Sequence, residues 1–386
     1  MNFKFKSLFV AIITATLLVS CSDNNDVPLT KVSKKLVIEN YAAIVLQNYK
    51  DALTDAQALE TAINTFATTP TEANFTTAKA AWKTARESYG TTEAFRFASG
   101  PIDIDDDAPE GLLNSWPLDE NYIDYVDTDA NSGIVNNPTT YPTITKASLL
   151  GVNQPGSNEK SVSIGYHAIE FLLWGQDLTA PADKKAGQRA YTDYTTKSNA
   201  DRRKEYLKVC ADLLTDHLQL LVTAWEGSYK TTFLALSEEV ALKNMFTGIA
   251  ILTKGELSGE RIFVAYDNKN QEDEHSCFSD NTDRDIRLNL NGIVNVYNGT
   301  YKNISGPSIK DLVNEAKATL GSEIATALTA AQTAVNATAT PFDFAISDAT
   351  ERPKVLVSVN SLNSLGDKFV EGGTAIGLKI SAELPD

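Results

Sequence analysis

The chain has 386 residues, and its 50 acidic residues outnumber its 34 basic ones, which gives a formal net charge of −16. Such an acidic chain repels the phosphate backbone, so nucleic acid is excluded as an expected partner and cations are the more natural ligands. Three cysteines are too few for a disulfide framework.

The start of the chain predicts a secreted lipoprotein. Lys4 and Lys6 give it a positive charge, and an uncharged apolar stretch follows over residues 8–19. This stretch is shorter than the roughly 20 apolar residues that span a bilayer. It ends in Leu-Val-Ser before Cys21, the pattern that lipoprotein signal peptidases cleave. Residues 1–20 are therefore the expected signal peptide and Cys21 the lipidated residue; a short membrane anchor or a buried strand is the alternative.

A polar tether is expected over residues 21–34. Residues 22–27 resemble the acidic sorting sequences that place some Gram-negative lipoproteins on the cell surface. The expected location is the outer membrane or the cell surface, with the lipid as the contact to the membrane. No later segment is long and apolar enough to span a bilayer.

The body of the chain has the periodicity of helices. Apolar residues recur every three or four positions over residues 37–66. A second helix is expected at Thr69, which can cap it, with Pro70 in the first position and Glu72 completing a capping box. The Pro-, Gly- and Asp-rich residues 98–161 show no period, which predicts a functional segment or one built from short elements.

Helical periodicity returns after this segment. A helix is expected over residues 164–174, then a polar linker over residues 176–201. Further stripes predict helices at 206–224, at 233–266 (weakened or broken by three glycines), from Thr282 to Gly299, continuously over 309–331, and from Val355. Segments with period two are scarce. The expected fold is all-α, with two helical-bundle domains in series over residues 35–185 and 186–386.

The three histidines differ in what their surroundings predict. His217 lies on an apolar stripe, so it is expected to be a packed core residue. His167 and Glu170 are three apart, and on a helix they share a face with Cβ atoms about 5–6 Å apart, so both could bind one metal ion. Acidic residues are common in this chain, and the spacing by itself is a weak signal.

His275 lies in the acidic run over residues 271–276. If that run is helical, Glu272 and His275 share a face, as in the Glu-x-x-His pairs of di-iron bundles. The pair at His167 runs in the opposite order, so a ferritin-like oxidase is poorly supported, and a solvated helix end is the alternative. The sequence contains neither H-E-x-x-H nor G-x-S-x-G, the signatures of zinc peptidases and of serine hydrolases.

Three stretches together resemble the imelysin family, also known as M75 peptidases. Residues 165–175 contain its G-x-H-x-x-E signature. Residues 114–119 read Asn-Ser-Trp-Pro-Leu-Asp, with Tyr122 and Asp124 after them. The third stretch is Gly-Glu-Leu-Ser-Gly-Glu-Arg at 255–261, followed by Glu-His-Ser-Cys-Phe-Ser-Asp-Asn-Thr at 274–282. They occur in the family's order, and the resemblance covers nearly the whole mature chain.

The resemblance implies an all-helical fold of two bundle-like domains, with the signature residues near the groove between them. It implies a cell-envelope lipoprotein that accompanies iron uptake. The candidate metal ligands are then His167, Glu170, Glu274 and His275. Residues expected near the site are Trp116, Asp119, Glu256, Arg261, Asp280 and Asp283. Relatives often carry histidine in place of Asp283, although an aspartate can still bind a hard cation.

Three functions compete at this point. The leading hypothesis is a lipid-anchored metal-binding protein that serves iron or haem uptake, with iron as the expected ion, zinc or manganese as alternatives, and an iron-uptake system as partner. The second is a metal-dependent peptidase of the M75 type, in which a metal at His167 and Glu170 activates water. The third is a protein that binds a larger ligand between the domains, such as haem or a metal-bridged acidic polysaccharide.

Overall fold

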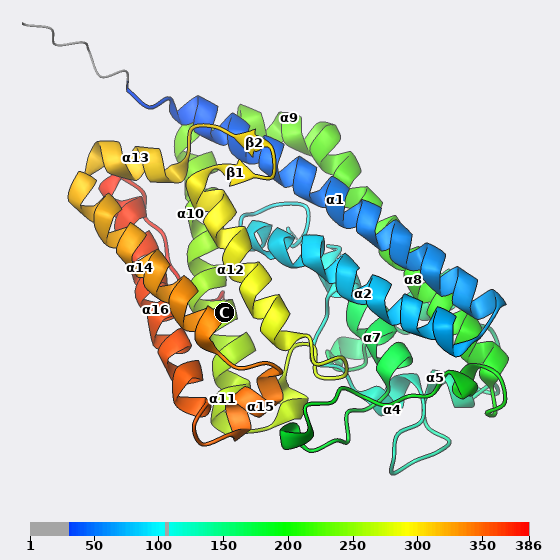
Figure 1. Cartoon of the computed structure of the whole chain (residues 1–386). Coiled ribbons are helices and arrows are strands. Elements are labelled where there is room, and N and C mark those ends of the chain that lie inside the picture. The colour runs from blue at the N-terminus through cyan, green and yellow to red at the C-terminus, as the bar shows by residue number, and fades with distance from the viewer. Residues whose placement is uncertain (1–30, 105–107, 386) are drawn as a thin grey trace, which may run out of the picture. The chain divides into compact units, whose positions relative to one another are not determined.

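The computed structural model describes residues 31–104 and 108–385, so the predicted signal peptide and Cys21 lie outside the described residues. Val32–Asp386 form one compact unit. Its regular structure is almost entirely helical, which confirms the all-α fold (Figure 1). In the described ranges the strands are β1 (Thr300–Tyr301) and β2 (Ile304–Ser305), paired antiparallel. Within those ranges no helix combines the length and apolarity needed to cross a bilayer.

Three long helices form a first group. They are α1 (Lys34–Thr68), α2 (Glu72–Thr92) and α8 (Ala200–Glu226), and α1 packs along both of the others (Figure 1). The buried positions of α1 recur every three or four residues, as the sequence predicts. α2 begins two residues later than expected, because Thr71 rather than Thr69 accepts the capping hydrogen bond, from the backbone N–H of Asn74.

A second group of helices packs around the last long helix of the chain. Its members are α10 (Glu238–Ile251), the π-helix η5 (Leu252–Phe263), α14 (Ala318–Ala337) and α16 (Arg352–Ala375). α12 (Thr282–Asn298) packs against α2 and also against η5 and α14, so it joins the two groups. The shorter helices of this part are α9 (Ser228–Ala235), α11 (Val264–Asn268), α13 (Ile309–Ala316) and α15 (Phe342–Ser347).

Two helices differ from the sequence prediction. The helix predicted over 233–266 breaks at Leu236 and Ser237, between α9 and α10, and not at its glycines. At residues 252–263 it continues as η5 with π-helical hydrogen bonding, in which each N–H bonds five residues back. A Cβ at Gly255 would lie 2.9 Å from Cγ of Leu384, so this position needs glycine. The helix predicted over 309–331 is two helices, because the backbone of Lys317 is extended, with φ −158° and ψ 88°, between α13 and α14.

The segment between α2 and α7 (Tyr166–Trp174) is built from short elements, which is one of the two possibilities that the sequence predicts. They are η1 (Glu93–Phe95), α3 (Glu110–Leu113), α4 (Glu120–Ile123), α5 (Gly133–Asn136), α6 (Lys146–Leu150) and η2 (Pro155–Ser157). The later short turns are η3 (Pro181–Asp183), η4 (Tyr191–Tyr194) and η6 (Gln271–Asp273). α8, which the sequence assigns to the second bundle, packs along α1; the division at residue 185 stays a prediction.

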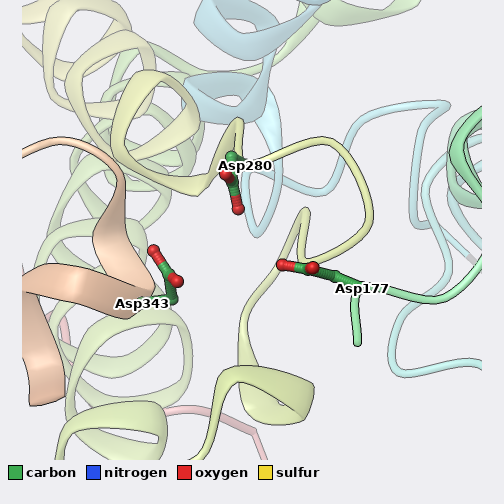
Figure 2. Close-up of side chains that lie close together, drawn as sticks. All are labelled: Asp177, Asp280 and Asp343. Carbon is green, nitrogen blue, oxygen red and sulfur yellow. The ribbon is translucent and has the colours of Figure 1, made fainter. Parts of the chain in front are cut away.

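Two groups of buried or partly buried acidic residues lie where these segments meet. Asp124, which follows α4, accepts hydrogen bonds from Nε and Nη2 of Arg203 at 2.6 and 2.9 Å and also pairs with Arg189. In the second group, α15 brings Asp343 close to Asp177 and Asp280, which come from two loops (Figure 2). The first group contains its own counter-charges, whereas the second contains carboxylates alone.

Candidate metal centre

The G-x-H-x-x-E motif forms the start of α7. Gly165 precedes the helix with φ +91°, and a Cβ at this residue would lie 2.8 Å from the carbonyl oxygen of Leu113. Only glycine combines this backbone conformation with so close an approach. The glycine therefore lets the helix begin directly against the last residues of α3, with all nine residues of α7 buried.

His167 and Glu170 lie one turn apart on α7, and their exposed fractions are 1% and 0%. Nδ1 of His167 is 2.8 Å from Oε2 of Glu170. Oε1 of Glu170 accepts hydrogen bonds from the backbone N–H of Ser279 at 2.9 Å and from its hydroxyl at 2.7 Å. The helical spacing thus brings the two side chains together as predicted, and the carboxyl group contacts the imidazole directly. In the part of the chain that the structure describes, Nε2 of His167 has no hydrogen-bond partner.

His275 brings a second imidazole to the same place. It lies in the turn between η6 and α12, with its ring centroid 4.7 Å from that of His167 and the two planes at 76°. Its Nδ1 is 2.9 Å from Oδ2 of Asp285, in the first turn of α12. The acidic run before His275 is a single 3-10 turn rather than the α-helix that a Glu272–His275 pair would need.

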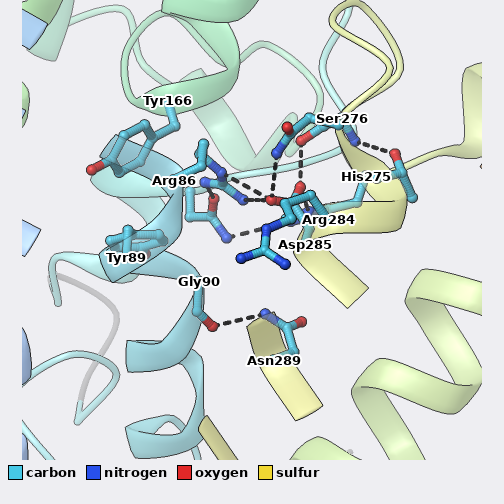
Figure 3. A network of polar contacts seen from close by, with 12 residues as sticks. Arg86, Tyr89, Gly90, Tyr166, His275, Ser276, Arg284, Asp285 and Asn289 are labelled. Carbon is cyan, nitrogen blue, oxygen red and sulfur yellow. Dashed lines mark hydrogen bonds and ion pairs between the residues drawn. The ribbon is translucent and has the colours of Figure 1, made fainter. Parts of the chain in front are cut away.

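Arg86 fixes the protonation of the second imidazole. Nε and Nη2 of Arg86, on α2, each lie 3.2 Å from Oδ1 of Asp285, and Nη1 donates to Oδ1 of Asn114 at 2.6 Å (Figure 3). Because arginine only donates, the NH2 group of Asn114 must face Nε2 of His275, at 3.4 Å. Nε2 of His275 is therefore the acceptor, and its Nδ1–H donates to Asp285.

Burial sets the charge of these groups. It lowers the pKa of His167 and of His275 to about 3, helped by Arg86 and Arg261, so both imidazoles are neutral at pH 7. Burial also raises the pKa of Glu170 to about 8. For Asp285 burial would raise the pKa, but Arg86 and the hydrogen bonds from His275 and Ser276 outweigh it and lower the pKa. Neutral imidazoles with a carboxyl group on Nδ1 are the usual form of histidine metal ligands.

A second polar group, centred on Arg261 of η5, borders the histidines. Nη2 of Arg261 lies 2.5 Å from Oε2 of Glu93, Nε lies 3.0 Å from Oε1 of Glu256, and Nη1 donates to Asn289 at 2.6 Å. Burial would raise the pKa of Glu93, yet Arg261 and Arg96 lower it to about 2. The guanidinium of Arg261 is therefore matched by an ionised carboxylate.

A cavity of about 350 Å³ opens beside this centre. His275 forms part of its wall, and Trp116 stands there with its ring centroid 5.7 Å from that of His275. His167 lies behind His275 and does not line the cavity. The remaining wall residues carry both charges; they are Arg96, Glu110, Asn114, Ser115, Pro117, Gln154, Glu159, Lys160, Glu256, Glu260 and Arg261.

The centre thus contains three of the residues expected from the sequence, and these belong to its two histidine–carboxyl pairs. His167, Glu170 and His275 form it, and Trp116, Glu256 and Arg261 lie at the adjoining cavity. The other predicted residues have different surroundings. Asp119 accepts from the side chain of Asn121, and Asp283 pairs with Arg287 and accepts from Thr340. Asp280 belongs to the aspartate group at α15. Burial, and after it the neighbouring Asp343 and Asp280, raise the pKa of Glu274. Whether any of them binds metal stays a prediction.

Sequence reasoning missed Asp285, Arg86, Asn114, Glu93 and Ser279. Asn114 and Ser279 lie in the stretches that resemble the family, but no role was assigned to them. Arg86 gave a signal too, because it falls on the buried stripe of α2, between Trp82 and Tyr89. A charged residue on such a stripe requires a buried counter-charge, which here is Asp285.

The comparisons with known proteins agree with these motifs. The sequence model of the imelysin family, peptidase M75, matches residues 45–369, which is most of the chain. The chain belongs to the imelysin family. One curated relative, named iron-regulated protein A, comes from Synechococcus elongatus; it is 23% identical over 337 residues, covering 84% of this chain and 81% of that protein.

A solved structure gives the same fold. It is that of a candidate iron-regulated protein A precursor from Parabacteroides distasonis, with a TM-score of 0.66 and 20% sequence identity. The match covers 89% of this chain and 97% of the other. The all-α imelysin fold expected from the sequence is therefore confirmed.

Proposed function

We propose that this imelysin-family chain binds a transition metal ion, with iron as the leading candidate and the imidazoles of His167 and His275 as ligands. The observation that carries the proposal is the buried Nε2 of His167, which lacks a hydrogen-bond partner among the described residues. An unpartnered buried polar atom costs about 1–3 kcal/mol, so it marks a place where a ligand is expected.

The surrounding groups support this assignment. Both imidazoles are neutral, and each has a carboxyl group at Nδ1, so the lone pair lies on Nε2 once Nδ1 holds the proton. On His275 that lone pair faces the NH2 group of Asn114 at 3.4 Å, and a bound metal ion would replace this contact. In this proposal Glu170 and Asp285 orient the ligands, whereas the sequence had Glu170 as a ligand itself. Imidazole nitrogen suits iron, zinc and manganese, and the name of the Synechococcus relative favours iron.

We also propose the cellular setting. Cys21, outside the described residues, is the lipidated residue that anchors the chain to the outer membrane or the cell surface, where it serves an iron-uptake system. Replacement by Cys21→Ala should abolish labelling with radioactive fatty acid and leave the signal peptide uncleaved. Labelling that persists in this variant contradicts the lipoprotein proposal.

The metal site is tested by thermal unfolding with and without metal. Binding to the folded state alone adds roughly 2.7 kcal/mol at a hundredfold excess over Kd, so Fe²⁺ added without oxygen should raise the melting temperature. His167→Ala should lose this shift. His217→Ala is the matched control, because His217 is also buried, on α8, and should keep the metal-dependent shift while losing stability.

The alternatives each have an arm in the same series. Zn²⁺ and Mn²⁺ test the identity of the ion, and haem tests a larger ligand. A protein substrate incubated with the metal-loaded chain, with and without chelator, tests the M75 peptidase alternative. If His167→Ala keeps the whole metal-induced shift, the centre is not the metal site.

A further inference from the structure

Three carboxylates from distant parts of the chain converge at the base of α15. Asp177 follows α7, Asp280 lies in the turn before α12, and Asp343 is the second residue of α15. Each offers an oxygen, and these oxygens lie within 4.8 Å of one another. Figure 2 shows the three carboxylates directed toward a common space. We refer to these residues as the aspartate cluster.

Among the described residues, Asp343 has no partner for its charge. Its exposed fraction is 1%, and neither of its oxygens has a hydrogen-bond partner in the described residues. The backbone amides of Phe344 and of Asp343 itself lower its pKa, but they do not reach hydrogen-bonding geometry. A nine-tenths buried carboxylate that is aimed into the cluster without partners is a second observation, independent of the gathering of acids, that calls for a ligand.

Only one of the two carboxylate oxygens of Asp177 has hydrogen-bond partners among the described residues. Its Oδ1 accepts hydrogen bonds from the backbone N–H and the hydroxyl of Thr179, at 3.0 and 2.9 Å. Its Oδ2 is buried without a partner in the part of the chain that the structure describes. The loop thus holds Asp177 in place by one oxygen and leaves the other for the cluster.

The nearest cations do not neutralise the cluster. Lys83 and Lys184 are close enough to lower the pKa of Asp280 and of Asp343 respectively, but Nζ of Lys184 stands 3.7 Å from the centre of the Phe344 ring. Burial and repulsion within the cluster win, raising the pKa of Asp280 to about 7 and that of Asp343 to about 6. Within residues 31–104 and 108–385, no salt bridge joins the three carboxylates to lysine or arginine.

We propose that the aspartate cluster binds a calcium ion, at a site separate from the histidines. Its donors are all oxygens, which suit a hard cation rather than the metals that imidazole prefers. Calcium ligands lie at about 2.3–2.6 Å, so two oxygens on opposite sides of the ion are up to roughly 5 Å apart. Magnesium ligands lie at about 2.0–2.1 Å and span roughly 4 Å. Oxygens that lie within 4.8 Å of one another can all reach one ion. Three protein carboxylates at one place favour calcium, because magnesium usually keeps several waters and is bound through one or two carboxylates.

Calcium at this place would join segments far apart in the sequence. It would fix the loop after α7, the turn before α12 and the start of α15 to one point. Ser279, which donates two hydrogen bonds to Glu170, directly precedes Asp280. The ion would therefore hold the turn that supports Glu170, although it does not touch the histidines.

The test is calorimetric titration of the metal-stripped protein with CaCl2. The wild type should bind calcium, and Asp343→Asn and Asp280→Asn should each weaken binding by at least about tenfold, since even loss of an outer partner of a metal ligand costs about 10–100-fold. Asp183→Asn is the matched control: Asp183 is exposed in η3, which packs against α15, and this variant should bind as the wild type does.

Several results would overturn the proposal. They are no calcium binding by the wild type, unchanged affinity in both Asp343→Asn and Asp280→Asn, or magnesium bound as tightly as calcium. Asp280 is only partly buried, so Asp280→Asn keeps the test valid if Asp343→Asn does not fold. His167→Ala should retain calcium binding, which separates failure of this site from failure of the histidine centre.

Discussion

Two buried acids, Asp124 and Asp343, show opposite ways of placing a carboxylate inside this molecule. Asp124 stands between the guanidinium groups of Arg189 and Arg203, and burial, which would raise its pKa, is outweighed by them, so that its pKa falls to about 2. Asp343 faces two other aspartates, and burial together with repulsion from Asp177 raises its pKa to about 6. Both residues are almost fully buried.

This difference distinguishes a buried carboxylate with a structural role from one that is expected to bind a ligand. A buried charge with its counter-charges in the chain is complete, and it fixes segments to one another. A buried charge without them is complete only when something outside the chain supplies the opposite charge. Asp124 lies in a stretch that resembles a family motif, yet its surroundings indicate a structural role.

The largest effect is expected from removing the charge of Asp124, which pairs with Arg189 and Arg203. Asp124→Asn leaves two buried guanidinium groups short of their counter-ion and should lower the free energy of unfolding by about 3–5 kcal/mol. Because the folded pKa is depressed, this stabilisation is present above about pH 4 and is lost as the pH falls toward 2. Denaturant unfolding at pH 7 measures it, with Asp201→Asn, 96% exposed on α8, as the control. A cost near that of the control would contradict the comparison.

The aspartate cluster should respond with the opposite sign. In chelator at pH 8 the three carboxylates repel one another, so Asp343→Asn should raise the free energy of unfolding, by about 1–2 kcal/mol. Adding calcium should then stabilise the wild type and leave the variant unchanged. Thermal unfolding with chelator and with calcium measures both effects. A variant that is less stable than the wild type in chelator would show that Asp343 is a structural group like Asp124.

Glu170 lies between the two extremes, since it has several hydrogen bonds and no arginine. Ser279→Ala removes one of its donors, but the backbone N–H of residue 279 and His167 remain, so we expect a loss of about 1 kcal/mol. Ser358→Ala is the matched control. That serine is equally buried on α16, and its hydroxyl donates only to the carbonyl of Lys354 one turn back, so its loss should be close to neutral. Equal costs in the two variants would argue against a special support for Glu170.

The smallest effect is expected at Lys146, which lies at the surface between two aspartates, whereas Asp124 is buried between two arginines. Nζ of Lys146 lies 2.7 Å from Asp212 and 2.6 Å from Asp216, but all three side chains are more than a third exposed. Solvent screens such pairs, so Lys146→Met should cost less than about 1 kcal/mol, and less still in high salt. Denaturant unfolding at low and high salt measures this. A cost as large as that of Asp124→Asn would show that burial is not what separates the two groups.

The helical periods predicted the fold class, and the three-residue spacing predicted that His167 and Glu170 meet. These are local properties of one helix, which the sequence expresses directly. The details that failed depend on partners elsewhere. The extended backbone at Lys317 has no signal in the apolar period, and Gly255 lies against Leu384, a residue far away in the sequence.

The choice of Asp283 instead of Asp285 has the same cause. The two residues are two positions apart on α12, so they point to different sides of the helix. Asp283 meets Arg287 and Thr340, whereas Asp285 meets Arg86 and His275. Only the placement of α2 against α12 decides which of them joins the centre. The sequence could not predict the aspartate cluster either, because successive members of the cluster are about 60 to 100 residues apart.

The π-helix η5 has a consequence for how imelysin sequences descend and are aligned. Its i→i+5 bonding lets Nε of Arg261 lie 3.0 Å from Glu256, five residues earlier. Deleting one residue between 252 and 260 would shift everything after it by about 100° around the helix axis, since an α-helix has 3.6 residues per turn. Arg261 would then turn away from Glu93 and Asn289. A relative with a one-residue gap in this segment should therefore lack the Glu93–Arg261 pair too, and the length of the segment and these two residues should be inherited together.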